Sequence, residues 1–201
     1  GLPSALVDRG LLQPVRWATA GTSLAVHSVL TGDSPIAMNL GGGFHHAFRD
    51  HGEGFCIYAD VAIALAVERA RGVLSPEDTV AVIDLDAHRG NGFWGICGAE
   101  RGIHVLDCFN AQVYPGMFPG DPETYPFQIP MRAGTSDVHY LNTIRQDVPQ
   151  FLDSLPRPKL AVYNAGTDIL AGDKLGQLSV SFDGVVQRDR FIVGGLLQRG
   201  I

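Results

Sequence analysis

The sequence predicts an α/β fold with a mainly parallel sheet flanked by helices. Three largely apolar stretches, at residues 79–86, 102–109 and 160–166, have the composition of strands that are covered on both faces, and the first of them is also rich in β-branched residues. Helical patterns alternate with them, as expected for a parallel sheet. A length of 201 residues fits one domain that buries a sizeable core, so we expect residues 1–201 to form a single domain.

The first half of the chain contains three further predicted elements. Residues 22–31 follow a Gly-Thr start and predict a short helix, and the apolar residues 35–40 predict a short strand. Residues 57–71 predict a longer helix with an apolar face, which Gly72 ends.

The second half contains one loop and two helices. Residues 110–136 carry five prolines and predict a loop. Residues 137–152 and 183–198 are amphipathic and predict helices. The side chains expected to point inward are Leu141, Ile144, Val148, Phe151 or Leu152, Val185, Ile192 and Leu196.

Composition narrows the class of protein. A net charge of -6 gives no electrostatic reason to expect direct nucleic-acid binding. The three cysteines are too few and wrongly spaced for a disulfide framework or a cysteine-based zinc site. Residues 1–12 lack the pattern of a signal peptide, and no stretch reaches the ~18 apolar residues of a membrane span. We therefore expect a cytoplasmic protein without membrane contact.

Polar side chains follow the predicted strands. Residues 35–40 run into "GGGFHH", residues 79–86 into "DLDAHRGNG", and residues 160–166 into "NAGTDILAGD". Ligands of open parallel sheets bind beyond the carboxyl ends of the strands. Acids and imidazoles are therefore expected to gather at one edge of the sheet.

Three of these side chains have the pattern of a metal site. Asp86 and His88 are two apart at a strand end and face the same way, and Asp168 arrives from another strand. Two carboxylates and one imidazole suit a catalytic zinc that keeps open positions. His45 and His46 would then lie beside the attacking water as base and acid.

Other polar residues could support this site. Asp84 and Asn91 could hold the second nitrogens of the two histidines and fix their tautomers. Taken singly, an Asp-x-His pair is more often a capped turn, and Asp168 reads as a helix N-cap. Asp107 is either structural or part of a second ion site. Only their joint occurrence at strand ends favours a catalytic centre.

Three segments match a known family. "GGGFHHAFRDHGEGFCIYADVAIAL", "VIDLDAHRGNG" and "YNAGTDILAGDKLGQLSVS" resemble the zinc-dependent histone deacetylase superfamily, and most of all its class IV branch and bacterial relatives. The resemblance covers roughly residues 11–201. It implies the three-layer arginase/deacetylase fold, with a mainly parallel sheet flanked by helices. The chain would be a partial copy of that fold, without its terminal strands.

The resemblance also implies residue roles. Gly54 and Phe55 match a segment whose Phe lines the acyl-lysine tunnel, and Tyr114 lies near the opposite aromatic wall. The implied zinc ligands are Asp86, His88 and Asp168; the implied tandem histidines are His45 and His46, with Asp84 and Asn91 as their partners. A potassium ion, as a structural ion, would involve Asp84, Asp86, His88 and Asp107.

One departure bears on activity. The family's "GGGY" segment, whose tyrosine polarises the substrate carbonyl, does not occur before the chain stops at Ile201. Rim loops at the N-terminal side are also missing. We therefore expect a piece of a longer protein that turns over slowly by itself, since loss of one oxyanion donor costs ~10²–10³ in rate.

The predicted function is zinc-dependent hydrolysis of an N-acyl-lysine amide, in which His46 takes a proton from water. One alternative is an amidohydrolase of the same fold that acts on acetylpolyamines or another acylated amine. Another is a non-catalytic module that binds metal or acyl-lysine. An arginase-like enzyme with paired manganese is disfavoured, because a His-His loop is not its signature.

Overall fold

The computed structural model describes residues 4–117 and 127–201. The chain divides into two compact units. Unit 1 comprises Gly1–Asp78 and Asn91–Arg101, and unit 2 comprises Thr79–Gly90 and Gly102–Ile201. That residues 1–201 act as one domain stays a prediction. Among the described residues, no helix combines the length and apolarity needed to cross a membrane.

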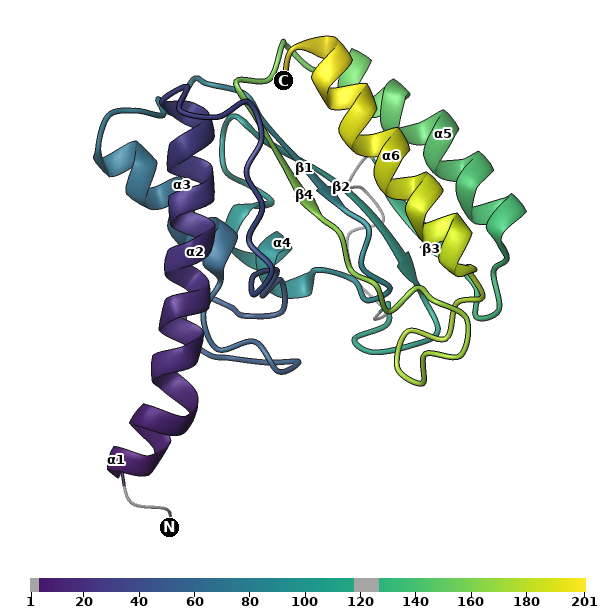
Figure 1. The fold of residues 1–201 in the computed structure, drawn as a ribbon, viewed down its shortest axis with the longest axis horizontal. Helices are drawn as coiled ribbons and strands as arrows, with labels where there is room; N and C mark the ends of the chain where they lie inside the picture. The colour runs from purple at the N-terminus through teal and green to yellow at the C-terminus, as the bar shows by residue number, and fades with distance from the viewer. Residues whose placement is uncertain (1–3, 118–126) are drawn as a thin grey trace. The chain divides into compact units, whose positions relative to one another are not determined.

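Unit 2 is built on a parallel sheet of four strands, which confirms the predicted fold class (Figure 1). The strands are β1 (Val80–Asp84), β2 (Ile103–Asn110), β3 (Gln128–Met131) and β4 (Leu160–Asn164), in the order β3-β2-β1-β4. After β1, the next two strands along the chain, β2 and β3, lie on one side of β1 in the sheet, and the last strand, β4, lies on its other side. The strand order therefore reverses between β1 and β4, where open α/β sheets bind their ligands.

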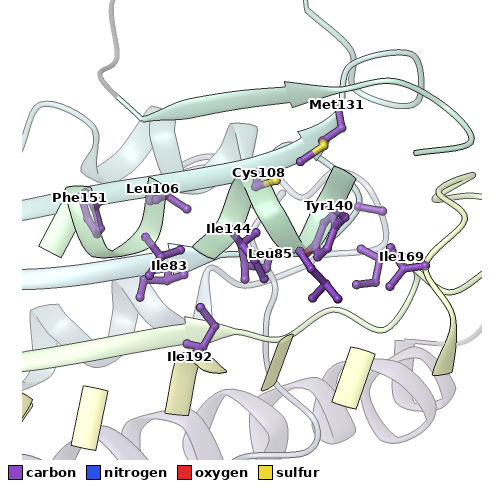
Figure 2. Packing of buried hydrophobic residues seen from close by; sticks show 14 of the residues in the cluster. Ile83, Leu85, Leu106, Cys108, Met131, Tyr140, Ile144, Phe151, Ile169 and Ile192 are labelled. Carbon is purple, nitrogen blue, oxygen red and sulfur yellow. The ribbon is translucent and has the colours of Figure 1, made fainter. Parts of the chain in front are cut away.

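Two helices cover one face of this sheet, α5 (Asp137–Ser154) and α6 (Phe182–Arg199) (Figure 1). Side chains of both helices pack with those of the strands in one apolar cluster, part of which is drawn in Figure 2. The side chains predicted to point inward are buried in the structure, namely Leu141, Ile144, Val148, Phe151, Leu152, Ile192 and Leu196. Val185 is partly buried. This burial accounts for the helical periodicity of both segments.

The loop predicted for residues 110–136 is wrong in one part, because β3 lies within it. Pro130 made this stretch look like a loop, since proline cannot donate to a strand ladder. Among the residues that the structure describes, β3 is an edge strand with β2 as its one neighbour, and Pro130 lies opposite Phe109, so the missing donor is tolerated. Pro119, Pro122 and Pro126 of the predicted loop lie outside the described residues.

The regular elements of unit 1 are helices in its described residues. They are α1 (Ser4–Val7), η1 (Asp8–Leu12), α2 (Gln13–Leu30), α3 (Asp60–Ala70) and α4 (Asn91–Cys97), and the segment between α2 and α3 is a long loop. The helix predicted for residues 22–31 is only the end of α2, while α3 falls within the predicted range. α4 was missed, because two glycines in seven residues lower its helix propensity.

The strand predicted for residues 35–40 is wrong. In the described part of the chain, its backbone makes no hydrogen bond to any strand. The Asn39 side chain instead donates to the Ala18 carbonyl at 2.8 Å and to Thr22 Oγ1 at 2.7 Å. These bonds hold the segment against α2 as an extended loop, and Leu40 is 92% exposed.

Candidate active site

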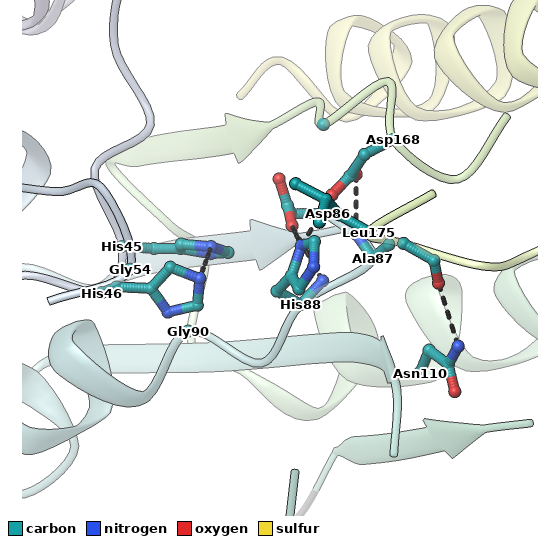
Figure 3. A network of polar contacts seen from close by, with 12 residues as sticks. His45, His46, Gly54, Asp86, Ala87, His88, Gly90, Asn110, Asp168 and Leu175 are labelled. Carbon is teal, nitrogen blue, oxygen red and sulfur yellow. Dashed lines mark hydrogen bonds and ion pairs between the residues drawn. The ribbon is translucent and has the colours of Figure 1, made fainter. Parts of the chain in front are cut away.

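Three side chains converge beyond the carboxyl ends of β1 and β4. Asp86 and His88 lie in the loop after β1, and Asp168 lies in the loop after β4 (Figure 3). One donor atom of each residue lies within 4.8 Å of the other two. Over residues 4–117 and 127–201, no other group of three His, Cys, Asp or Glu side chains meets this condition. The group therefore sits where the strand order reverses.

The chemistry of this group fits a cation. His88 Nδ1 lies 2.7 Å from Asp168 Oδ2 and 3.0 Å from Asp86 Oδ1. Hydrogen bonds to Asp168 and then to Asp86 raise the pKa of His88 from 6.5 to about 10. The two carboxylates thus stabilise positive charge between them. Two oxygen donors and one imidazole nitrogen suit a zinc ion.

The backbone fixes both carboxylates. The Ala87 amide donates to Asp168 Oδ1 at 3.0 Å, and the His88 amide donates to Asp86 Oδ1 at 2.8 Å. Gly166 packs so closely that a Cβ there would come within 2.4 Å of Asp86 Oδ2. Glycine is thus required at position 166 for Asp86 to keep its place.

Arg188 of α6 holds the two loops together. This arginine is fully buried, and its Nη1 donates to the Leu85 carbonyl at 3.1 Å and to the Gly166 carbonyl at 2.7 Å. The sequence analysis did not identify it, because an arginine on an amphipathic helix normally faces water. A signal existed: Arg188 lies between Val185 and Ile192 on the apolar stripe of the helix.

Two buried carboxylates lie side by side, Asp84 at the end of β1 and Asp107 within β2, where they are register partners. Asp84 accepts from Asn164 Nδ2 at 3.0 Å and from the Asp86 amide at 3.2 Å. Asp107 accepts from the Gly90 amide at 3.1 Å. Their role at a second cation stays a prediction.

The tandem histidines belong to unit 1. His45 Nε2 and His46 Nε2 lie 3.1 Å apart, and His46 Nδ1 lies 2.7 Å from Asn91 Oδ1. Both imidazoles are buried. Two imidazole nitrogens can hydrogen bond only when one of them carries the proton. The pair is therefore able to hold a proton between its rings.

Asp60 at the start of α3 anchors the glycine-rich loop before these histidines. Its buried carboxylate accepts from the Gly43 amide at 2.9 Å, the Phe44 amide at 2.8 Å and Thr22 Oγ1 at 2.6 Å. Sequence reasoning missed Asp60. Its signal was an acid inside the apolar run "YADVAIAL".

The expected substrate residues have distinct environments. Gly54 and Phe55 both have positive φ, 51° and 64°, in a turn between Glu53 and Cys56. A phenylalanine rarely adopts this conformation, which marks a constrained position. Phe55 is 94% exposed and Tyr114 is 44% exposed. Their contact with substrate stays a prediction.

Within each unit, the structure brings the expected residues together: Asp86, His88 and Asp168 in unit 2, and His45, His46 and Asn91 in unit 1. Two expectations join residues of both units and stay predictions. These are the pairing of Asp84 with His45 and the placement of the tandem histidines beside Asp86, His88 and Asp168.

Comparison with known proteins gives a consistent result. The model of the histone deacetylase domain matches residues 3–199. The protein named "Histone deacetylase 2" of Arabidopsis thaliana is 37% identical over 188 residues, which are 93% of this chain and 46% of that protein.

Two solved structures have a similar fold. A histone deacetylase homologue in complex with SAHA is 25% identical with a TM-score of 0.76, and the match covers 88% of this chain and 48% of that one. An acetylpolyamine aminohydrolase from Burkholderia pseudomallei is 28% identical with a TM-score of 0.75, over 90% of this chain and 53% of that one. The chain spans about half the length of these proteins.

Proposed function

Because the chain belongs to the histone deacetylase domain family, we propose that it forms the catalytic region of a zinc-dependent amidohydrolase that removes acyl groups from lysine side chains. The observation that carries this proposal is the convergence of Asp86, His88 and Asp168 where the strand order reverses. An imidazole whose pKa is strongly shifted by two specific carboxylates, at the position where such sheets bind ligands, is characteristic of functional sites.

Asp86, His88 and Asp168 would hold the zinc ion. Bound there, zinc supplies Lewis acidity, which polarises an amide carbonyl and lowers the pKa of water to near ~7. The amides of Ala87 and His88, together with Arg188, keep the two carboxylates oriented. This support reduces the reorganisation needed when the metal binds.

The tandem histidines would move the protons. Since His46 Nδ1 faces the acceptor Asn91 Oδ1, it carries a proton, and Nε2 is the basic atom. During hydrolysis a water adds to the amide carbon, its proton passes to His46, and the C–N bond breaks. The leaving amine takes a proton from one of the two imidazoles, so a carboxylic acid and a free amine result.

The choice of substrate rests on the relatives. The name of the Arabidopsis protein favours acyl-lysine, and the family's Phe position is occupied by the exposed Phe55. The similarity to an acetylpolyamine aminohydrolase favours a second candidate, a small acylated polyamine. The net charge of -6 suits either cationic substrate and does not separate them.

A direct comparison of substrates tests the proposal. Acetate release by the zinc-loaded protein is measured with an N-acetyl-lysine peptide and with an acetylated polyamine. We expect faster release from the peptide, and a ~10²–10⁴-fold loss in His46→Ala. Faster release from the polyamine would select the second candidate. A zinc-loaded protein that binds the peptide without releasing acetate would make it a non-catalytic module.

A further inference from the structure

A row of polar side chains leads outward from His46 within unit 1. Asn91, which accepts from His46 through Oδ1, donates through Nδ2 to Glu53 Oε1 at 3.0 Å. The other oxygen of Glu53 lies 3.6 Å from His51 Nε2. His51 Nδ1 in turn lies 2.8 Å from Asp50 Oδ1. The buried imidazole of His46 is thus linked through Asn91 to the carboxylate of Glu53, whose side chain is 36% exposed.

The carboxylate of Glu53 determines which way the Asn91 amide faces. An asparagine amide has a donor end and an acceptor end, and only its surroundings decide which end meets a neighbour. An ionised carboxylate accepts hydrogen bonds and donates none, so Glu53 can pair only with Asn91 Nδ2. The carbonyl Oδ1 must then point to His46, where it can pair only with a protonated Nδ1.

The turn that carries Glu53 also touches the ring of His46. Glu53 and Cys56 exchange backbone hydrogen bonds, of 3.0 Å and 2.7 Å, around Gly54 and Phe55. A Cβ on Gly54 would come within 2.4 Å of His46 Cδ2, so only glycine allows this approach. The same turn therefore packs against the imidazole and holds the carboxylate at Asn91.

From these contacts we propose that Glu53 is a positioning residue that acts through Asn91. Its carboxylate orients the Asn91 amide, and the amide keeps the proton of neutral His46 on Nδ1 and leaves Nε2 basic. Asn91 is uncharged, so Glu53 supplies the acceptor that fixes its orientation. The catalytic consequence rests on the proposed function, whereas the tautomer is a property of the folded chain itself.

The tautomer can be read by NMR without any turnover. Two-bond proton–nitrogen correlations of ¹⁵N-histidine protein, recorded where His46 is neutral, distinguish a protonated Nδ1 from a protonated Nε2. We expect a protonated Nδ1 in the wild type and a mixture of both tautomers in Glu53→Ala. Glu53→Gln has a donor end as well as an acceptor end and no longer excludes the reversed Asn91 amide, so we expect the Nε2-protonated form to appear in this variant as well.

A substitution of Asn91 provides the most specific control. In Asn91→Asp the partner of His46 has two equivalent oxygens and no donor end, so its orientation no longer matters. We therefore expect Glu53→Ala to change the tautomer in the wild-type background and not in the Asn91→Asp background. Asp50→Ala removes a nearby carboxylate that does not contact Asn91, and it should leave the tautomer unchanged.

Turnover supplies the second readout. If the proposed hydrolysis occurs, Glu53→Ala should lower kcat by ~10–100-fold with an unchanged KM, as for other residues that orient a catalytic group. A wild type without turnover, but with the expected change of tautomer, would overturn the proposed function and leave the role of Glu53 intact. A folded Glu53→Ala, or Glu53→Gln if the former does not fold, is compared with Asp50→Ala. The proposal is overturned if the Glu53 variant that is measured keeps a fully Nδ1-protonated His46, or if Asp50→Ala loses the Nδ1-protonated form.

Discussion

His88 and Asp168 follow different strands, yet His88 Nδ1 lies 2.7 Å from Asp168 Oδ2. The contact joins the loop after β1 to the loop after β4, and Asp86 completes it at 3.0 Å from the same nitrogen. The imidazole therefore lies between two carboxylates at the reversal of strand order. This arrangement of donor atoms is the basis of the proposed zinc site.

Metal binding should displace the proton of His88. In the metal-free protein the pKa of His88 is raised to about 10, so its imidazole is charged at neutral pH, whereas a metal ligand must be neutral. We expect release of about one proton per zinc at pH 7 and an affinity that rises about tenfold per pH unit below pH 10. Calorimetry in buffers of different ionisation enthalpy measures the protons released. Uptake without proton release would show that His88 is not a ligand.

The free energy of unfolding of the metal-free protein should depend on pH through the same titration of His88. The pKa of His88 is higher in the folded chain, about 10, than its ordinary value of 6.5. The stabilisation from its ion pairs is therefore complete below pH 6.5 and is lost as the pH rises through 10. Urea unfolding of metal-free wild type and His88→Ala across this range is the measurement, and a constant difference between the two would contradict it.

Arg188→Met should destabilise the protein and weaken zinc binding. The change removes the donor to the Leu85 and Gly166 carbonyls, and each buried acceptor left unpaired costs about 1–3 kcal/mol. Arg190→Met, at an exposed position of the same helix, is the matched control. Urea unfolding and zinc titration of both variants are compared. Equal behaviour of the two would refute the role assigned to Arg188.

Gly166→Ala should reduce zinc affinity without removing a ligand, because the new Cβ would push Asp86 out of place. A Cβ on Gly194 of α6 meets no atom within 4 Å, so Gly194→Ala should stabilise the helix by about 0.5–1 kcal/mol and leave zinc affinity unchanged. Zinc titration and thermal unfolding of both variants check this. Wild-type affinity in Gly166→Ala would mean that Asp86 tolerates displacement or is not a ligand.

Asp60→Ala should impair turnover while zinc binding persists. Two loop amides next to His45, from Gly43 and Phe44, lose a charged acceptor, and such bonds contribute about 1.5–3 kcal/mol each. Thr22→Val removes only a hydroxyl partner of the same carboxylate and should have a smaller effect. Zinc content and acetate release are measured side by side. Loss of zinc together with activity would indicate general unfolding.

Strands and helices with a strong pattern were predictable from the sequence. The apolar composition of β1, β2 and β4 and the periodicity of α5 and α6 reflect burial that the structure confirms. Elements that depend on their neighbours were not. Pro130 can lie in β3 because this strand is at the edge of the sheet. Residues 35–40 form a loop, since the Asn39 side chain bonds to α2.

The residues of the candidate site also fall into a predictable and an unpredictable group. Asp86, His88 and Asp168 could be predicted, because each follows a recognisable strand in a chain whose strands are parallel. The roles of Arg188, Asp60 and Glu53 could not, since each acts through bonds to backbone or amide groups far away in sequence, and the position of Arg188 or Asp60 among apolar residues indicates burial without naming the partner. Such contacts leave no fixed spacing in the sequence.

The most direct test of the account is the zinc content of the purified protein beside Asp168→Ala, measured by elemental analysis after dialysis. Asp183→Ala, an exposed carboxylate of α6, serves as the control. We predict about one zinc per chain in the wild type and in Asp183→Ala, and none in a folded Asp168→Ala. Equal zinc in all three proteins, or none in a folded wild type, would contradict the proposed metal centre and the hydrolysis built on it.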